Sequence, residues 1–188
     1  MIKAIKILLL ILILFPACQR GKETRYIPLS EADKSFVTYS ELDEIPFIHS
    51  NGFEFKLIVE SKTISTAQSE TKHPRDNYST YEVLKCRLTS VEPELNILMN
   101  LLPKDFKPEL SFRINSESFY HAGLYLDTET LADMDSIVLN NETYFDVFLI
   151  EKPVYDSLII MPLAILYTKD EGIIKINMSN NETFTINR

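Results

Sequence analysis

Residues 45–60, Ile-Pro-Phe-Ile-His-Ser-Asn-Gly-Phe-Glu-Phe-Lys-Leu-Ile-Val-Glu, decide the fold class of this chain. In the second half of the stretch, apolar and polar residues alternate, which is the period of a β-strand with one buried face. Asn51-Gly52 stands between two apolar runs, and this dipeptide is the strongest short signal for a β-hairpin. A turn of that type needs positive φ at both central residues. The stretch therefore predicts two antiparallel strands joined by a tight turn.

The same pattern recurs along the rest of the chain. Leu84, Cys86 and Leu88, for example, alternate with polar neighbours. Runs rich in Asn, Asp, Ser and Gly separate these segments and predict further hairpins. The expected strands lie within residues 78–91, 95–101, 110–114, 119–126, 137–139, 143–151, 159–168, 172–177 and 182–186. We expect a mostly β fold, a single antiparallel β-sandwich or half-open barrel of roughly 8–10 strands.

Two regions do not follow this pattern. Residues 30–33, Ser-Glu-Ala-Asp, could open a capped helix, while residues 35–39, Ser-Phe-Val-Thr-Tyr, could form a strand. Residues 66–77 are polar and aperiodic, which predicts an exposed loop. The fold prediction therefore allows one short helix, from residues 30–44 or 128–135.

The N-terminus carries a signal for export. Lys3 and Lys6 precede an apolar run that ends at Pro16-Ala17-Cys18, which resembles the lipobox of bacterial lipoprotein signals. An uncleaved helical anchor needs about 20 apolar residues, and residues 5–17 are too few. We expect a signal peptide at 1–17, a lipidated N-terminus and polar tether at 18–25 with lipid on Cys18, and one β-rich domain at 26–188.

Charge and cysteine content narrow the choice of partners. The chain has 27 acidic against 19 basic residues, a formal net charge of −8, so nucleic acid is an unsuitable partner. Removal of residues 1–17 takes away two lysines and makes the mature chain more acidic still. Lipidation of Cys18 leaves Cys86 as a free thiol, and its period-two position predicts a core residue and not a nucleophile.

No motif for catalysis or for a cofactor stands out. The chain has four glycines and lacks a phosphate loop and a nucleophile elbow. His49, His73 and His121 lie far apart, with no second ligand at metal spacing. The acidic segment 127–135 could offer oxygens to calcium, but its spacing does not match an EF-hand and a solvated loop explains it. We expect no cofactor, no metal and no enzymatic activity.

The C-terminal stretch 166–176, Leu-Tyr-Thr-Lys-Asp-Glu-Gly-Ile-Ile-Lys-Ile, resembles the closing hairpin of small uncharacterised lipoproteins of the Bacteroidota type. Residues 143–147 are similar to the strand region that precedes it in that family. The resemblance implies an envelope location and a β fold. It also implies candidate O-glycosylation sites at Ser136 and Ser157, each within an Asp-Ser-aliphatic triplet.

Three functions remain open at this point. The first is a lipid-anchored β domain that binds another envelope component, a protein, glycan or lipid, without enzymatic activity. The second is a carrier that shelters a lipid or acyl chain in a half-barrel. The third is a hydrolase that acts on an envelope polymer through paired carboxylates. The outer membrane is the expected location, because no aspartate follows Cys18 as an inner-membrane retention signal.

Overall fold

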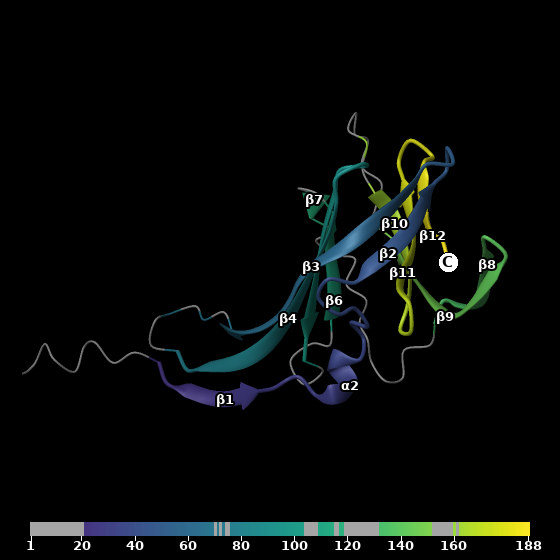
Figure 1. The fold of residues 1–188 in the computed structure, drawn as a ribbon. Helices are drawn as coiled ribbons and strands as arrows, with labels where there is room; N and C mark the ends of the chain where they lie inside the picture. The colour runs from purple at the N-terminus through teal and green to yellow at the C-terminus, as the bar shows by residue number, and fades with distance from the viewer. Residues whose placement is uncertain are drawn as a thin grey trace, which may run out of the picture.

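The computed structural model describes residues 21–69, 71, 73, 76–103, 109–114, 117–118, 132–151, 160 and 162–188. Eleven strands form one antiparallel sheet in the order β7-β6-β5-β4-β3-β2-β12-β11-β10-β9-β8, and β1 pairs in parallel with β4 (Figure 1). The strands of the N-terminal half are β1 (Glu23–Ile27), β2 (Glu44–His49), β3 (Glu54–Gln68), β4 (Tyr78–Ser90), β5 (Leu95–Leu102), β6 (Glu109–Ile114) and β7 (Glu117–Ser118). Those of the C-terminal half are β8 (Met134–Leu139), β9 (Glu142–Glu151), β10 (Pro162–Thr168), β11 (Gly172–Met178) and β12 (Thr183–Ile186).

The sheet confirms the predicted mostly β, antiparallel fold with one short helix. It is continuous and not closed into a barrel, and its two meanders join where β2 pairs with β12. The strand count exceeds the prediction, partly because residues 23–25, assigned to the tether, belong to β1. Hydrogen bonds explain their place: Tyr78 N–H donates to the Lys22 carbonyl at 3.1 Å, and the Thr24 hydroxyl donates to the Tyr78 carbonyl at 3.0 Å.

Two hairpin turns differ in a way that corrects the sequence analysis. At Asn51-Gly52 only Gly52 has positive φ, at 91°, and its N–H donates to the His49 carbonyl. The prediction of positive φ at both residues was wrong there, because the loop has an extra residue and needs a single left-handed position. The β8–β9 turn instead has Asn140 and Asn141 at φ 50° and 67°, which is the two-residue geometry.

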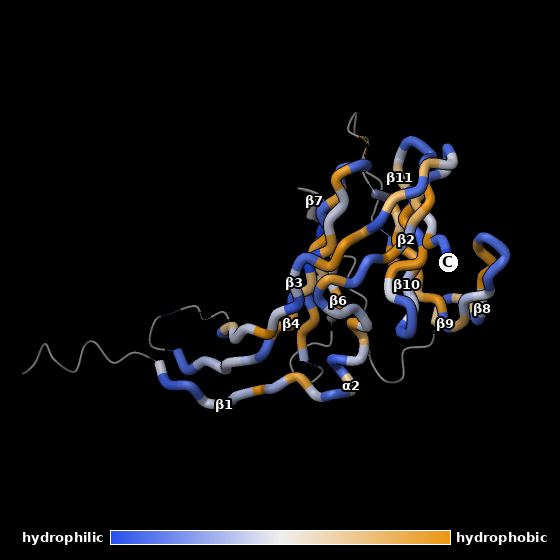
Figure 2. Tube along the Cα trace, viewed as in Figure 1, coloured by the Kyte–Doolittle hydropathy of each residue, from blue (hydrophilic) through white to orange (hydrophobic). Residues whose placement is uncertain are grey.

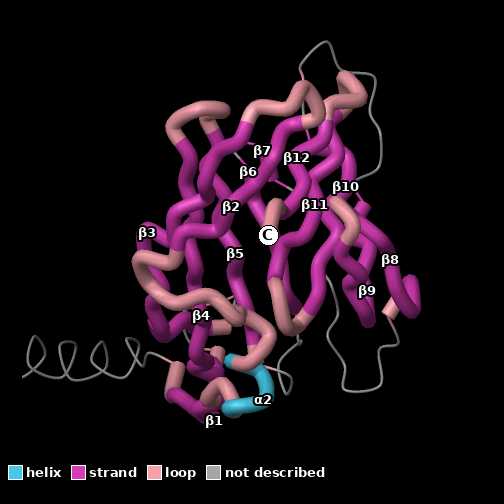
Figure 3. Tube along the Cα trace, turned by 45° about the vertical axis from the view of Figure 1, so that its right-hand side comes forward, coloured by secondary structure: helices cyan, strands magenta, loops and turns pink. Residues whose placement is uncertain are grey.

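Helix α2 (Glu31–Lys34) lies at one end of the body, close to β1 (Figure 3). Ser30 and Asp33 form a capping box in which each side chain accepts a backbone N–H of the other, which is the capped helix that the sequence allowed. The alternative strand at 35–39 does not form. Instead Phe36, Val37 and Tyr39 are buried in the core.

The β8–β9 hairpin folds back over the outer face of the neighbouring strands. The Asn140 side chain at its turn donates to the Ile186 carbonyl of β12 at 2.9 Å. Asp146, at φ 51°, breaks the regular path of β9, so that only residues 148–151 pair with β10. Because this hairpin covers one face, β10 and β11 bury side chains on both faces.

One part of the sheet projects from the body. We define the arm as residues 60–68 of β3, residues 78–83 of β4, and β1 (Figure 1). The strands of the body are mostly hydrophobic, whereas the outer part of the arm is mostly hydrophilic (Figure 2). The predicted loop at 66–77 is shorter than expected, because residues 66–68 still pair with β4.

Candidate functional site

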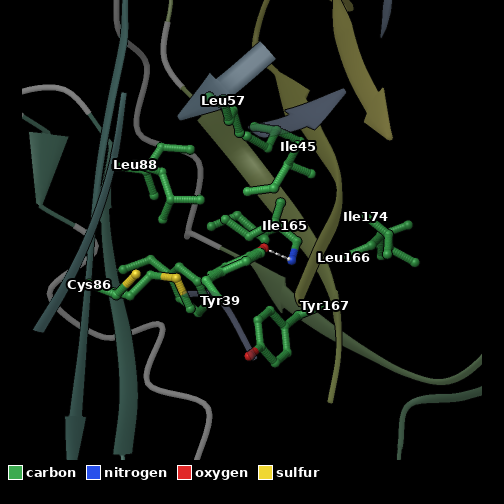
Figure 4. Packing of buried hydrophobic residues seen from close by; sticks show 14 of the residues in the cluster. Tyr39, Ile45, Leu57, Cys86, Leu88, Ile165, Leu166, Tyr167 and Ile174 are labelled. Atoms are coloured by element: carbon green, nitrogen blue, oxygen red, sulfur yellow. Dashed lines mark hydrogen bonds between the residues drawn. The ribbon is translucent and has the colours of Figure 1, made fainter. Parts of the chain in front are cut away.

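The concave side of the body is filled by the chain itself. We call residues 35–43 the plug segment. Tyr39 of this segment lies between Cys86 and Leu88 of β4 on one side and Ile165 and Tyr167 of β10 on the other (Figure 4). The rings of Phe112 and Tyr167, from opposite halves of the sheet, meet edge-on at 5.7 Å between centroids. In the described residues this interior is a packed core.

Buried polar groups fix the plug segment in place. The Tyr167 hydroxyl donates to the Phe36 carbonyl, and Ile173 N–H donates to the Tyr39 hydroxyl oxygen at 2.5 Å. Burial raises the pKa of both phenols, so both stay neutral and available for these bonds at physiological pH. The Lys62 ammonium donates to the carbonyls of Val37 and Tyr39, each at 2.8 Å.

Gly172 has two roles in the turn between β10 and β11. Its φ is 77°, and an added Cβ would overlap the Tyr39 phenol. The glycine therefore provides both the left-handed turn residue and the space for a plug side chain.

Cys86 has the role that its position predicts. The thiol is free and fully buried, and it lies opposite Lys62 on the neighbouring strand. Burial raises its pKa to about 11 despite the nearby Lys62 ammonium. A thiol that stays protonated in an enclosed core is not a nucleophile.

An open depression of about 200 Å³ at the rim gathers four carboxylates, from Asp43, Glu44, Asp170 and Glu171. Most of them already have partners. Glu171 forms an ion pair with Arg188, Lys56 donates to Glu44 at 2.5 Å, and Ser40 N–H donates to Asp43 at 2.6 Å. Three of the four carboxylates therefore accept hydrogen bonds or form ion pairs within the chain.

The arm presents a strand edge that the described residues leave open. On the side of β3 away from β4, pairing with β2 ends at Ile58, and Val59 still exchanges hydrogen bonds with Leu42 and Asp43. A register shift between Val59 and Ser61 follows. Beyond it, the backbone N–H of Lys62 donates to the Glu41 carboxylate at 3.0 Å. The backbone groups of Lys62 therefore point away from β4.

The direction of the backbone N–H and C=O groups alternates along a strand, which gives their direction in the remaining residues of this edge. Backbone groups of every second residue point to the same side of a strand, so those of Ile64, Thr66 and Gln68 also point outward. Ser69 N–H donates to the Ser79 carbonyl of β4 at 2.8 Å, in agreement with this phase. No described residue pairs with the outward groups of these three residues. We call residues 62–68 the open edge.

Side chains on the open edge are uncharged after Lys62 and are solvated. Residues 63–66 are exposed, and the Ile64 side chain is 49% exposed. The other border of the arm, β1, carries the charges of Glu23 and Arg25. Natural proteins commonly place charges on strand edges to prevent pairing with other chains. Residues 63–68 of the open edge lack that protection.

The structure describes only some of the other candidate site residues. Cys18, Ser157 and His121 lie outside the described residues, as does most of the acidic segment 127–135. Ser136 is exposed on β8, opposite Phe145, and remains a candidate for O-glycosylation.

The acidic segment and the histidines take local roles where they are described. Asp133 accepts the Leu149 N–H at 2.7 Å. His49 Nε2 lies 3.6 Å from Glu182 Oε2, and the His49 ring packs against Phe184. The backbone N–H of His73 donates to the Asp76 carboxylate. Among the described residues no group of three His, Cys, Asp or Glu side chains could hold a metal ion. Within the same residues no helix is long and apolar enough to cross a membrane.

In the described residues the fold is a β domain with a packed interior and an open strand edge on a projecting arm. No family model matches the chain, and neither a curated protein nor a solved structure matches it.

The plug segment and the open edge were not predictable from local sequence patterns. Alternation up to Glu60 predicted the first part of β3 but not its extension to Gln68, and the pairing of each edge depends on tertiary neighbours. A usable signal was the loss of large apolar residues after Val59, where Ser, Thr and Ala dominate.

Proposed function

We propose that this chain is a lipid-anchored envelope domain that binds another envelope component through its arm and has no enzymatic activity. The observation that carries the proposal is the open edge of β3, whose outward backbone groups lack partners among the described residues. Unpaired edge groups bind an added strand through main-chain hydrogen bonds, the mode called β-augmentation.

The position of the arm in the chain supports a role at a membrane. Residues 23–27 form β1 within the arm, and Cys18 precedes Glu23 by five residues. A chain of five residues spans at most about 18 Å. A lipid on Cys18 would therefore hold the arm close to the bilayer surface, with the outer membrane as the expected location.

The packed interior argues against the carrier alternative. A pocket for a small lipid-like ligand needs about 300–1,000 Å³ and an apolar lining. The plug segment occupies the concave side with Phe36, Val37 and Tyr39, which are at most 7% exposed. The hydrolase alternative is also less well supported, because Asp43, Glu44 and Glu171 already bind groups of the chain itself.

Photo-cross-linking in cells tests the proposal. A photoreactive phenylalanine analogue replaces Ile64 on the arm of the full-length chain, and in a matched variant it replaces Phe145 on β9. Phe145 is 66% exposed and lies in the body. We expect a discrete adduct with an envelope component from the Ile64 position and none from the Phe145 position. Equal labelling from both positions, or a reproducible hydrolytic activity of the purified protein, would contradict the proposal.

A further inference from the structure

The open edge is suited to pairing with the same edge of another molecule. Its residues 63–68, Thr-Ile-Ser-Thr-Ala-Gln, contain no charge and no proline. Residues 63–68 of two chains can therefore approach without repulsion between their own side chains, although the full chain carries a formal net charge of −8. The arm projects from the body, so contact through the arm keeps the acidic bodies apart (Figure 1).

We propose that the partner at the open edge is a second copy of this chain, paired antiparallel about a two-fold axis at Ser65. This inference rests on the proposed function, because it names the component that the arm binds. A two-fold pair joins the same surface of both copies and uses the open edge of each, so that this contact does not repeat. The result is a dimer and not a fibre.

The axis position follows from the extent of the open edge. An antiparallel copy overlaps residues 62–68 completely only when the axis passes through their midpoint, Ser65. Ile64 then lies opposite Thr66 of the other copy, and these outward-facing residues can exchange both of their backbone hydrogen bonds. The Lys62 carbonyl of each copy can also accept the Gln68 N–H of the other copy. Together with the two Ile64–Thr66 pairs, the register provides about six main-chain hydrogen bonds. Glu41, bound to Lys62 N–H, limits the overlap at one end.

The same register makes a geometric prediction about side chains. Ser65 has its backbone groups directed to β4, so the two Ser65 residues form a non-hydrogen-bonded pair with Cα atoms about 4.5 Å apart. That spacing suits a disulfide. Thr63 lies opposite Ala67 of the other copy, whereas the two copies of Thr63 are about four residues apart along the strand, or roughly 13 Å.

An edge of this length is small for a stable interface in dilute solution, where specific interfaces bury about 1,200–2,000 Å². Anchoring of both copies in one membrane raises their effective concentration and favours the pair. The test therefore uses the full-length, membrane-attached chain.

Disulfide trapping in membranes tests the proposal and its register. Ser65→Cys should form a covalent dimer under mild oxidation, whereas Thr63→Cys alone and Ala67→Cys alone should not. Two differently tagged copies, one with Thr63→Cys and one with Ala67→Cys, should form a mixed dimer. Cys86 does not interfere, because it is buried and protonated.

A proline variant provides the matched control. Thr66→Pro removes an outward N–H, which a strand edge tolerates, and should abolish the mixed dimer while leaving the thermal midpoint nearly unchanged. Absence of dimer from Ser65→Cys and from the mixed pair would overturn the inference. If the Ile64 photo-cross-linker then labels a different protein, the proposed function stands and only the second copy is wrong. If it labels nothing, both fail.

Discussion

Strand β3 passes through two environments, and the comparison between them separates the body from the arm. In the first half Phe55, Leu57 and Val59 are 8%, 0% and 0% exposed; β2 pairs with residues 54–58, and β4 pairs with the strand from Ile58 onward. In the second half Ile64 is 49% exposed and one edge is open. The backbone is a strand throughout, so the neighbours decide whether it forms a core or an available surface.

The largest expected effect is on the buried half of this strand. Leu57→Ala should lower the free energy of unfolding by about 3 kcal/mol, because the side chain is fully buried and leaves a cavity. Ile64→Ala, on the same strand, should cost less than about 1 kcal/mol because half of its surface is already solvated. Chemical denaturation of both variants measures the difference. Equal losses would show that the arm is part of the core.

A second pair of variants tests the packing of the plug segment. Gly172→Ala should lower the free energy of unfolding by about 2–3 kcal/mol, since its Cβ overlaps the Tyr39 phenol and its φ is 77°. Gly52→Ala has similar backbone strain at φ 91° but open space around the Cβ, and should cost about 1 kcal/mol. The comparison uses thermal and urea unfolding. A Gly172 variant no less stable than the Gly52 variant would contradict the packing of Tyr39 against the turn.

The buried thiol predicts a loss of stability in alkali. Folding raises the Cys86 pKa from 9.0 to about 11, so the folded state retains its proton where the unfolded state has lost it. The free energy of unfolding is unaffected by this group below pH 9 and falls by about 1.4 kcal/mol per unit between pH 9 and 11. Cys86→Ala should lower stability at neutral pH and reduce that slope. An unchanged slope would mean that the thiol is not desolvated.

The smallest expected effect concerns one hydroxyl. Tyr167→Phe removes the donor to the Phe36 carbonyl and should cost about 1–2 kcal/mol, because that carbonyl is left without its partner. Tyr26→Phe is the control on the arm, where the hydroxyl donates to Glu82 at 2.6 Å but the side chain is 50% exposed. Its cost should be below about 0.5 kcal/mol. Unfolding midpoints at pH 7 distinguish the two, and equal values would contradict the role of Tyr167.

Local patterns in the sequence were sufficient for the elements but not for their arrangement. The alternation of Leu84, Cys86 and Leu88 correctly predicted a strand with one buried face, and the capped helix that Ser30 and Asp33 allowed is the one that forms. The sequence could not show that β2 pairs with β12, because strands so far apart in the chain leave no local signal of their contact. The sequence also allowed a strand at residues 35–39, but Phe36 and Tyr39 are core residues of a segment that is not a strand.

Amide hydrogen exchange of the full chain, resolved by residue, tests the central claim most directly. In dilute monomer the N–H groups of Ile64, Thr66 and Gln68 should exchange fast, those of Ser65 and Ala67 more slowly, and those of Ile165 and Ile173 slowest. In membranes at high protein density the first three should gain protection while the others do not change. Strong protection of Ile64, Thr66 and Gln68 in the monomer would show that the edge is already covered and would contradict the account.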